Sequence, residues 1–250
     1  MKKFIKRQYQ EYKILLQNIP ALVVCLFILS VVCMNLLANK ELFNVKYLAL
    51  DCGFALSWIS FLCMDIICKR YGPKASNKIS ILAVAINLCI CLIFNLLSKT
   101  PGNWGEFYSS SNPAIGEAIN NSLNNTFGGT WYVVVGSTIA MVVAAFVNSG
   151  INWSLGKIFS NSSYKHFAIR SFISTSLAQF CDNLVFAILV SKIFFGWTWV
   201  QVILCSATGA LLELVCEIIF SPIGYKISQN WESEAIGQKY LDFIKEGSNR

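Results

Sequence analysis

The chain has 250 residues, of which 55% are apolar or aromatic and only 13% are charged. A soluble domain of this size could not cover so much apolar surface with polar side chains, so the composition excludes an ordinary water-soluble protein and indicates a membrane protein. A single His (His166) and ten cysteines, almost all inside apolar stretches and never as Cys-x-x-Cys, exclude a metal cluster of the usual spacing, and we expect no metal and no cofactor.

Six apolar stretches are long enough to cross a bilayer, because about twenty helical residues span roughly 30 Å of hydrocarbon. In chain order they cover residues 14–39, 47–68, 79–98, 131–151, 171–191 and 200–224. The first is interpreted as a transmembrane helix and not as a cleaved signal peptide, because it is too long and no small-residue cleavage site follows it. The sequence therefore predicts an all-α polytopic protein, with residues 1–250 forming a single membrane domain of six transmembrane helices.

The connections carry two clear signals. Tyr71-Gly72-Pro73 is a stop signal after the second predicted span. The longest connection, residues 99–129, is rich in Asn, Ser and Gly, and we expect an outer loop that forms a lid or is simply flexible.

The net charge of +7 could suggest a nucleic-acid partner, but the positions of the basic residues indicate another cause. Of the 20 Lys and Arg residues, 16 fall on the side of the predicted membrane that holds both termini. Only Lys40, Lys46, Lys99 and Lys192 fall on the other side. The positive-inside rule therefore predicts cytoplasmic N- and C-termini in the plasma membrane, and no nucleic-acid partner is expected.

Acidic residues inside the predicted spans are the first candidates for function, since an ionisable group at the centre of a transmembrane helix costs roughly 2.5–3.5 kcal/mol. Asp51 lies near a helix end and can reach the interface. Asp65 precedes Lys69 by four residues, so an ordinary ion pair explains it sufficiently. Asp182 is different, because it lies near the middle of the fifth span with no basic residue closer than Lys192.

Two patterns place polar groups together. Gln179, Asp182 and Phe186 share one helix face at i, i+3 and i+7. Glu213 and Glu217 are spaced i, i+4 on the last span, where two ionised carboxylates would repel, so one is protonated or a cation lies between them. No Lys or Arg lies deep in any predicted span, so a proton, a metal cation or a cationic ligand must supply the counter-charge. This pattern favours a transporter.

Other classes fit less well. An intramembrane aspartyl protease would need two Asp at similar depth, whereas Asp65 and Asp182 lie at different depths without a Gly-x-Gly-Asp context. No nucleophile–base arrangement or phosphate loop is present, so we expect no enzyme, and unpaired acids disfavour a purely structural membrane protein. Asn35 and Asn148 could face the same interior as the acids or hydrogen-bond between helices.

Two motifs occur together: Ser-Thr-x3-Gln-x2-Asp-x3-Phe over residues 174–186, and Glu-x4-Pro-x2-Tyr over residues 217–225. With Asn35–Lys40, Tyr71-Gly72 and Arg170, they resemble the queuosine precursor transporters, also called the vitamin uptake transporter family, over roughly residues 20–226. The chain departs from the family at four positions. The family often has an acidic residue where this chain has Lys69, and a basic residue where it has Glu213. It often has Gly in place of Ala178 and Asp in place of Asn148.

The resemblance implies import of a 7-deazaguanine base, namely 7-cyano-7-deazaguanine, 7-aminomethyl-7-deazaguanine or queuine, bound near the middle of the membrane with alternating exposure to the two sides. The residues implied to contact the base are Asn35, Trp58, Asp65, Gln179, Asp182, Phe186, Glu213 and Glu217. Asp182 and Glu217 would bind the base edge or amine, and Gln179 and Asn35 would hydrogen-bond to it. Phe186 or Trp58 could stack on the ring.

Three further expectations depend on the resemblance. The aminomethyl base and queuine are cationic and would supply the counter-charge missing near Glu213 and Glu217, so a cationic member of the series is expected. The family resembles the substrate-binding subunits of energy-coupling-factor transporters, so the partner could be such an ATP-driven module, or the coupling could use protons. The first span lacks the Ala-x3-Ala of such subunits, which favours self-sufficient transport. The alternative function is a substrate-binding subunit for another vitamin-like molecule.

Overall fold

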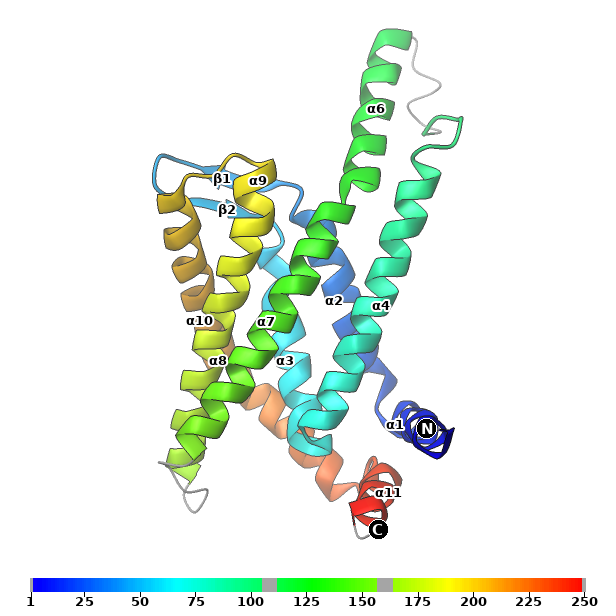
Figure 1. Cartoon of the computed structure of the whole chain (residues 1–250), viewed down its shortest axis with the longest axis vertical. Coiled ribbons are helices and arrows are strands. Elements are labelled where there is room, and N and C mark those ends of the chain that lie inside the picture. The colour runs from blue at the N-terminus through cyan, green and yellow to red at the C-terminus, as the bar shows by residue number, and fades with distance from the viewer. Residues whose placement is uncertain (1, 105–111, 157–163, 249–250) are drawn as a thin grey trace. The chain divides into compact units, whose positions relative to one another are not determined.

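A computed structural model describes residues 2–104, 112–156 and 164–248. Within these ranges the regular structure is helical apart from one two-stranded hairpin (Figure 1). Two compact units interleave in sequence. Unit 1 comprises Met1–Val31, Leu56–Ile86 and Cys216–Arg250, and unit 2 comprises Val32–Ala55 and Asn87–Val215.

Unit 1 begins with a sharp break in the chain. Helix α1 (Lys2–Asn18) and helix α2 (Ala21–Leu37) differ in direction by 105° across Ile19 and Pro20. Proline has no N–H to donate and disfavours the helical conformation of the residue before it, so the helix cannot run through this point. The prediction of one continuous span over residues 14–39 is therefore wrong, and α2 is the strongly apolar part of that stretch.

The remainder of unit 1 is helical. It contains α3 (Phe54–Tyr71) from Leu56 onward, the first part of α4 (Pro73–Leu97), the end of α10 (Trp199–Ser233) and α11 (Gln238–Ser248). Gly72 has a φ of +86°, which Gly adopts without strain, and Pro73 opens the next helix. The predicted stop signal at Tyr71-Gly72-Pro73 is confirmed. Helix α10 continues to Ser233 through Pro222, beyond the predicted limit at residue 224.

In unit 2, strands replace the start of the second predicted span. Strands β1 (Glu41–Asn44) and β2 (Ala49–Asp51) pair antiparallel, with Glu41 opposite Asp51, and α3 begins only at Phe54. The prediction of a helix from residue 47 is therefore wrong. Ala49 of β2 is instead buried in a cluster with Trp197, Val202 and Cys205, so contacts within the protein account for an apolar residue here.

The predicted outer loop over residues 99–129 is also largely wrong, because helix α6 (Pro113–Gly129) occupies its second half. Asn112 caps this helix, since its side-chain oxygen accepts a hydrogen bond from the Ala114 N–H at 3.1 Å, and Pro113 fits the first turn. Asn95 of α4 donates to the Gly128 carbonyl at 2.9 Å. A composition typical of loops is thus used here for capping and for contact between α4 and α6.

Helix α7 (Trp131–Gly156) packs against α8 (Tyr164–Phe186), the long helix that carries the polar face. Helix α8 ends in a π-helical turn, η1 (Ala187–Ser191), and α9 (Lys192–Phe194) follows it. A Cβ on Gly136 of α7 would lie 2.3 Å from a methyl group of Val190, so this glycine permits the close approach of the two elements. Ala38, Val133 and Val190 form a buried cluster at this contact.

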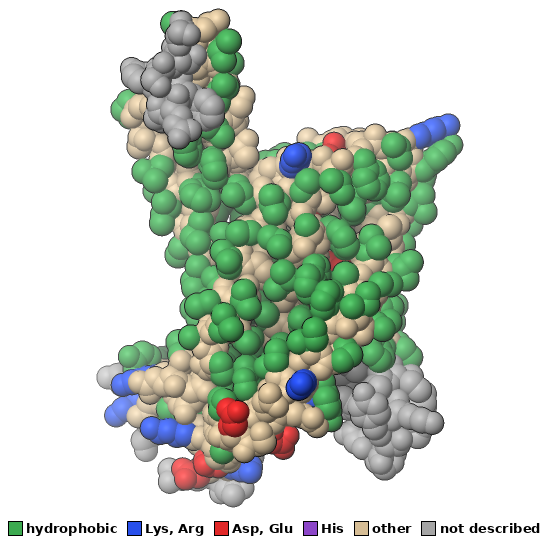
Figure 2. Space-filling model, turned by 180° about the vertical axis from the view of Figure 1, so that it is seen from behind, with side chains coloured by type: hydrophobic (Ala, Val, Ile, Leu, Met, Phe, Trp, Pro, Cys, Tyr) green, Lys and Arg blue, Asp and Glu red, His purple; other side chains and the backbone are tan. Residues whose placement is uncertain are grey.

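Four helical segments are long and apolar enough to cross a membrane, or five if the bent α1–α2 pair counts as one span. The four are Pro73–Leu97, Pro113–Ala144, Phe172–Phe194 and Trp199–Phe220. Helix α3 is less apolar, because it contains Asp65, Lys69 and Arg70. Figure 2 shows hydrophobic side chains covering the helices, as expected for a protein surrounded by lipid, and charged side chains gathered around α1 and α11. The chain is a polytopic all-α membrane protein.

Candidate ligand-binding site

The amide of Gln179 on α8 is the most unusual polar group in the described part of the chain. Its residue is only 1% exposed, and neither its nitrogen nor its oxygen has a hydrogen-bond partner among the described residues. A buried polar group without a partner costs roughly 1–3 kcal/mol, and the cost is higher where no water can reach. Gln179 therefore offers a buried amide that can donate a hydrogen bond to a ligand and accept one from it.

Asp182 lies one turn further along the same face of α8. Its side chain is partly buried, and within the described residues it has no hydrogen bond and no ion pair. The i, i+3 spacing of Gln179 and Asp182 follows directly from the helical periodicity, and α8 is continuous through both residues. The predicted polar face is therefore helical throughout, and it contains two side chains of complementary chemistry that have no partner among the described residues.

A third polar residue connects α8 to α10. Asn183 donates a hydrogen bond from Nδ2 to Oε2 of Glu213 at 3.2 Å, and Glu213 is only 4% exposed. A Cβ on Gly209 would lie 3.0 Å from the Asn183 nitrogen, so the glycine leaves the space that this amide occupies. Sequence reasoning missed Asn183 as a site residue, although its place four residues after Gln179 was a usable signal.

The other predicted residues of unit 2 are Asn35 and Phe186. Asn35 on α2 is 3% exposed, as expected for a polar side chain turned away from lipid. Phe186 packs against the cluster of Ala38, Val133 and Val190. This packing accounts for a large apolar side chain at this position without a ligand. Stacking of Phe186 on a bound base stays a prediction.

Three predicted site residues belong to unit 1. Trp58 stacks on Phe220 with ring centroids 4.4 Å apart and planes 17° from parallel. The side chains of Asp65 and Glu217 lie outside what the structure describes, although both backbones are helical. The same holds for Asn148 on α7. The predicted pairing of Glu213 with Glu217 and the contacts of Asp65 therefore stay predictions.

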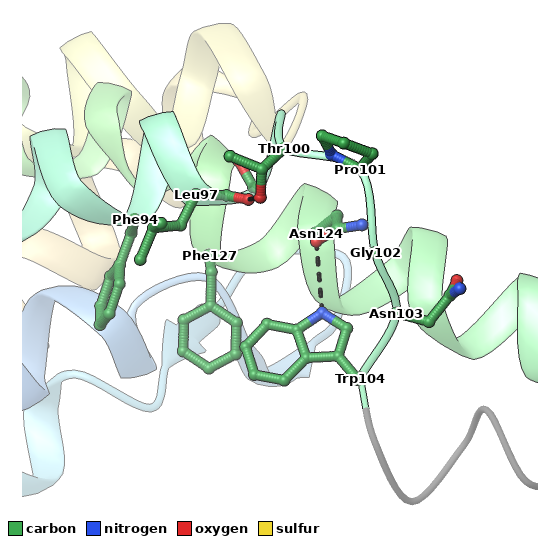
Figure 3. Close-up of a pocket in the computed structure, with 10 residues that line it drawn as sticks. Phe94, Leu97, Thr100, Pro101, Gly102, Asn103, Trp104, Asn124 and Phe127 are labelled. Carbon is green, nitrogen blue, oxygen red and sulfur yellow. Dashed lines mark hydrogen bonds between the residues drawn. The ribbon is translucent and has the colours of Figure 1, made fainter.

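A pocket of about 440 Å³ opens between the ends of α4 and α6. Figure 3 shows Trp104 beside Phe127, and the Trp104 indole donates to Asn124 at 3.2 Å. Among the described residues, the pocket is lined by none of the predicted site residues. It is not part of the candidate site.

Comparison with known proteins gives the family of the chain but does not bear on the site residues. The sequence model of one family, described as "Putative vitamin uptake transporter", matches residues 51–227. No curated protein and no solved structure matches the chain. The matched region contains α8 with Gln179 and Asp182, and most of α10, including Glu213. The chain therefore belongs to the vitamin uptake transporter family, a family of membrane transporters and not of enzymes.

Proposed function

We propose that the chain imports a queuosine precursor, that is, a 7-deazaguanine base, and binds it at the face of α8 that contains Gln179 and Asp182. The observation that carries the proposal is the unpartnered amide of Gln179 in the interior of unit 2. Membership of a family of vitamin uptake transporters supports a small-molecule substrate.

The chemistry of the two side chains suits such a base. A guanine-like edge places a carbonyl acceptor beside N–H donors. The amide of Gln179 can donate to the carbonyl and accept from a neighbouring N–H, while the Asp182 carboxylate accepts from adjacent N–H groups. Each partner would satisfy a group that is unsatisfied without ligand, so binding recovers the free energy that the empty site lacks.

The charges favour a cationic member of the series, 7-aminomethyl-7-deazaguanine or queuine. Asp182 has no basic partner among the described residues. A protonated amine would compensate this carboxylate, whereas the neutral 7-cyano-7-deazaguanine would not. Glu217, Asp65, Trp58, Asn35 and Phe186 stay candidate contacts on the strength of the family resemblance.

The proposal includes a topology. Six crossings, with α3 among them, would place both termini in the cytoplasm and 16 of the 20 basic residues on that side of the plasma membrane. The fold would then resemble the substrate-binding subunits of energy-coupling-factor transporters. The alternative is a substrate-binding subunit for another vitamin-like molecule that docks to an ATP-driven module. The family description supports only the vitamin-like substrate of this alternative.

Binding measurements on the purified protein test the proposal. We expect queuine and the aminomethyl base to raise the melting temperature, the cyano base to do so less, and guanine to serve as the control. Gln179→Met and Asp182→Asn should each abolish the shift, whereas Gln17→Met, a change at an exposed position on α1, should leave it intact.

The outcomes separate the alternatives. A shift with another vitamin and none with any deazaguanine would support the alternative function. Equal binding of the cyano and amine compounds, or unchanged amine uptake by Glu217→Gln, would contradict the cationic preference. Binding that survives Gln179→Met would remove the proposed site from α8.

A further inference from the structure

We infer that helix α1 lies on the bilayer surface and binds the headgroups of anionic lipids. The apolar side chains Ile5, Tyr9 and Leu16 follow the i, i+4, i+11 spacing of one helix face, and they are 59%, 70% and 42% exposed. An apolar stripe of this kind on a charged helix is typical of helices that lie in the membrane interface.

The direction of α1 agrees with this placement. It is turned by 105° from α2, whose residues are almost all apolar and which follows it directly. A helix nearly perpendicular to a membrane-crossing helix runs along the membrane plane. An exposed apolar stripe on such a helix can be buried in the interface without any change in the rest of unit 1.

The opposite face of α1 is fixed to the start of a candidate membrane span. Glu11, only 1% exposed, pairs with Lys74 at 3.3 Å and with Lys78 at 3.0 Å, both in the first two turns of α4. Tyr240 of α11 donates to the same carboxylate at 3.4 Å. These contacts hold α1 at the level where α4 enters the bilayer. The depth of α1 in the membrane is therefore fixed by its contacts with α4 and α11 within unit 1.

The charges on α1 identify the headgroup. Lys6, Arg7 and Lys13 are exposed, and none of them pairs with an acidic side chain among the described residues. On the helical wheel, Lys6 and Lys13 lie next to the apolar stripe, so they would reach the headgroups when the stripe is buried. Basic residues near an anionic leaflet strengthen association about fivefold each, whereas zwitterionic headgroups give no such gain. The occupant is therefore an anionic phospholipid surface.

Photocrosslinking of the full-length protein tests the inference. The photoreactive residue p-benzoylphenylalanine is placed either at Tyr9, on the stripe, or at the neighbouring Gln10, which is exposed but off the stripe. The protein is reconstituted in phosphatidylcholine vesicles containing phosphatidylglycerol. We expect lipid adducts by mass spectrometry to be several-fold more abundant at position 9 than at position 10. Equal yields at the two positions, or protein-sized adducts at position 9, would overturn the inference.

A second arm tests the charge requirement. Lys6→Gln/Arg7→Gln/Lys13→Gln should reduce the phosphatidylglycerol adduct at position 9 several-fold and leave the phosphatidylcholine adduct nearly unchanged. Lys239→Gln/Lys245→Gln on α11 removes exposed charge from the same unit and should have no such effect. An unchanged phosphatidylglycerol adduct in the triple variant, with melting temperature preserved, would refute anionic headgroup binding.

Discussion

One buried polar group in each unit of this transporter gives an instructive contrast. In unit 1 the buried carboxylate of Glu11 has two lysines and a tyrosine as partners. In unit 2 the buried amide of Gln179 has none among the described residues, and Asp182 beside it has none either. A fully hydrogen-bonded network holds helices in place. Buried polar groups without partners instead gain hydrogen bonds when a ligand of complementary chemistry binds, and this gain favours binding. The difference separates a structural cluster from a candidate binding site.

The largest effect on stability is expected at the satisfied cluster. Glu11→Ala leaves Lys78 nearly buried without its counter-charge, and breaking such a pair costs about 3 kcal/mol. We expect the melting temperature in detergent to fall by several degrees. Substrate affinity, measured well below the melting temperatures of both proteins, should be unchanged. Glu234→Ala, at an exposed position, is the control and should stay within about 0.5 kcal/mol of wild type.

The opposite sign is expected in unit 2. Gln179→Met replaces an unpartnered buried amide with an apolar side chain of similar length, so the ligand-free protein should gain about 1–2 kcal/mol of stability while losing substrate binding. Thermal unfolding without ligand measures the gain. A loss of stability would mean that the amide has a partner in the empty protein, and the comparison between the units would fail.

A smaller effect is expected at the contact between α8 and α10. Gly209→Ala places a Cβ 3.0 Å from the Asn183 amide, so that amide must shift and its bond to Glu213 weakens. We expect a loss of about 1 kcal/mol, the value of one such hydrogen bond. Gly150→Ala is the matched control, because a Cβ there meets no neighbouring atom of the described residues within 4 Å. If both variants unfold at the same temperature, the Asn183 contact contributes little.

The smallest effect concerns pH, where the two units should differ in sign. Burial would raise the pKa of Glu11, but hydrogen bonds from Lys78 and Lys74 outweigh it and lower that pKa below the ordinary value. In unit 2, burial raises the pKa of Asp51 to about 6, although backbone N–H groups of Gly53 and Phe54 oppose the shift, and Glu41 opposite it adds to it. A lowered pKa stabilises at high pH and a raised one at low pH.

Melting curves from about pH 3 to about pH 8 test this sign difference. The contribution of Glu11 to stability is present above its ordinary pKa and is lost on acidification. The melting temperature of Glu11→Gln should therefore fall less at low pH than that of the wild type. The contribution of Asp51 is present at the acid end and is lost as the pH rises through about 6, so Asp51→Asn should raise the melting temperature by about 2–4 °C near pH 7.5. No change in Asp51→Asn would indicate that the carboxyl is solvated.

Much of the fold could be predicted from hydropathy, and the errors of that prediction share one cause. The apolar runs located α4, α7, α8 and α10 because a helix in lipid must be apolar over about twenty residues. The same measure cannot recognise apolar residues buried by protein, as at Ala49 in the hairpin. It also cannot recognise a polar helix that is capped and packed, as in α6, where the Asn112 cap was read only as loop composition.

The sequence by itself determined that this protein lives in a bilayer, and it placed Gln179 and Asp182 on one face, since helical periodicity needs no tertiary information. Only the tertiary structure decided which polar groups are satisfied. Asn183 finds Glu213 across 30 positions of sequence, and Glu11 finds Lys78 across 67, whereas Gln179 finds no partner in the described chain. Partnership depends on which helices pack together, and that is a property of the folded chain.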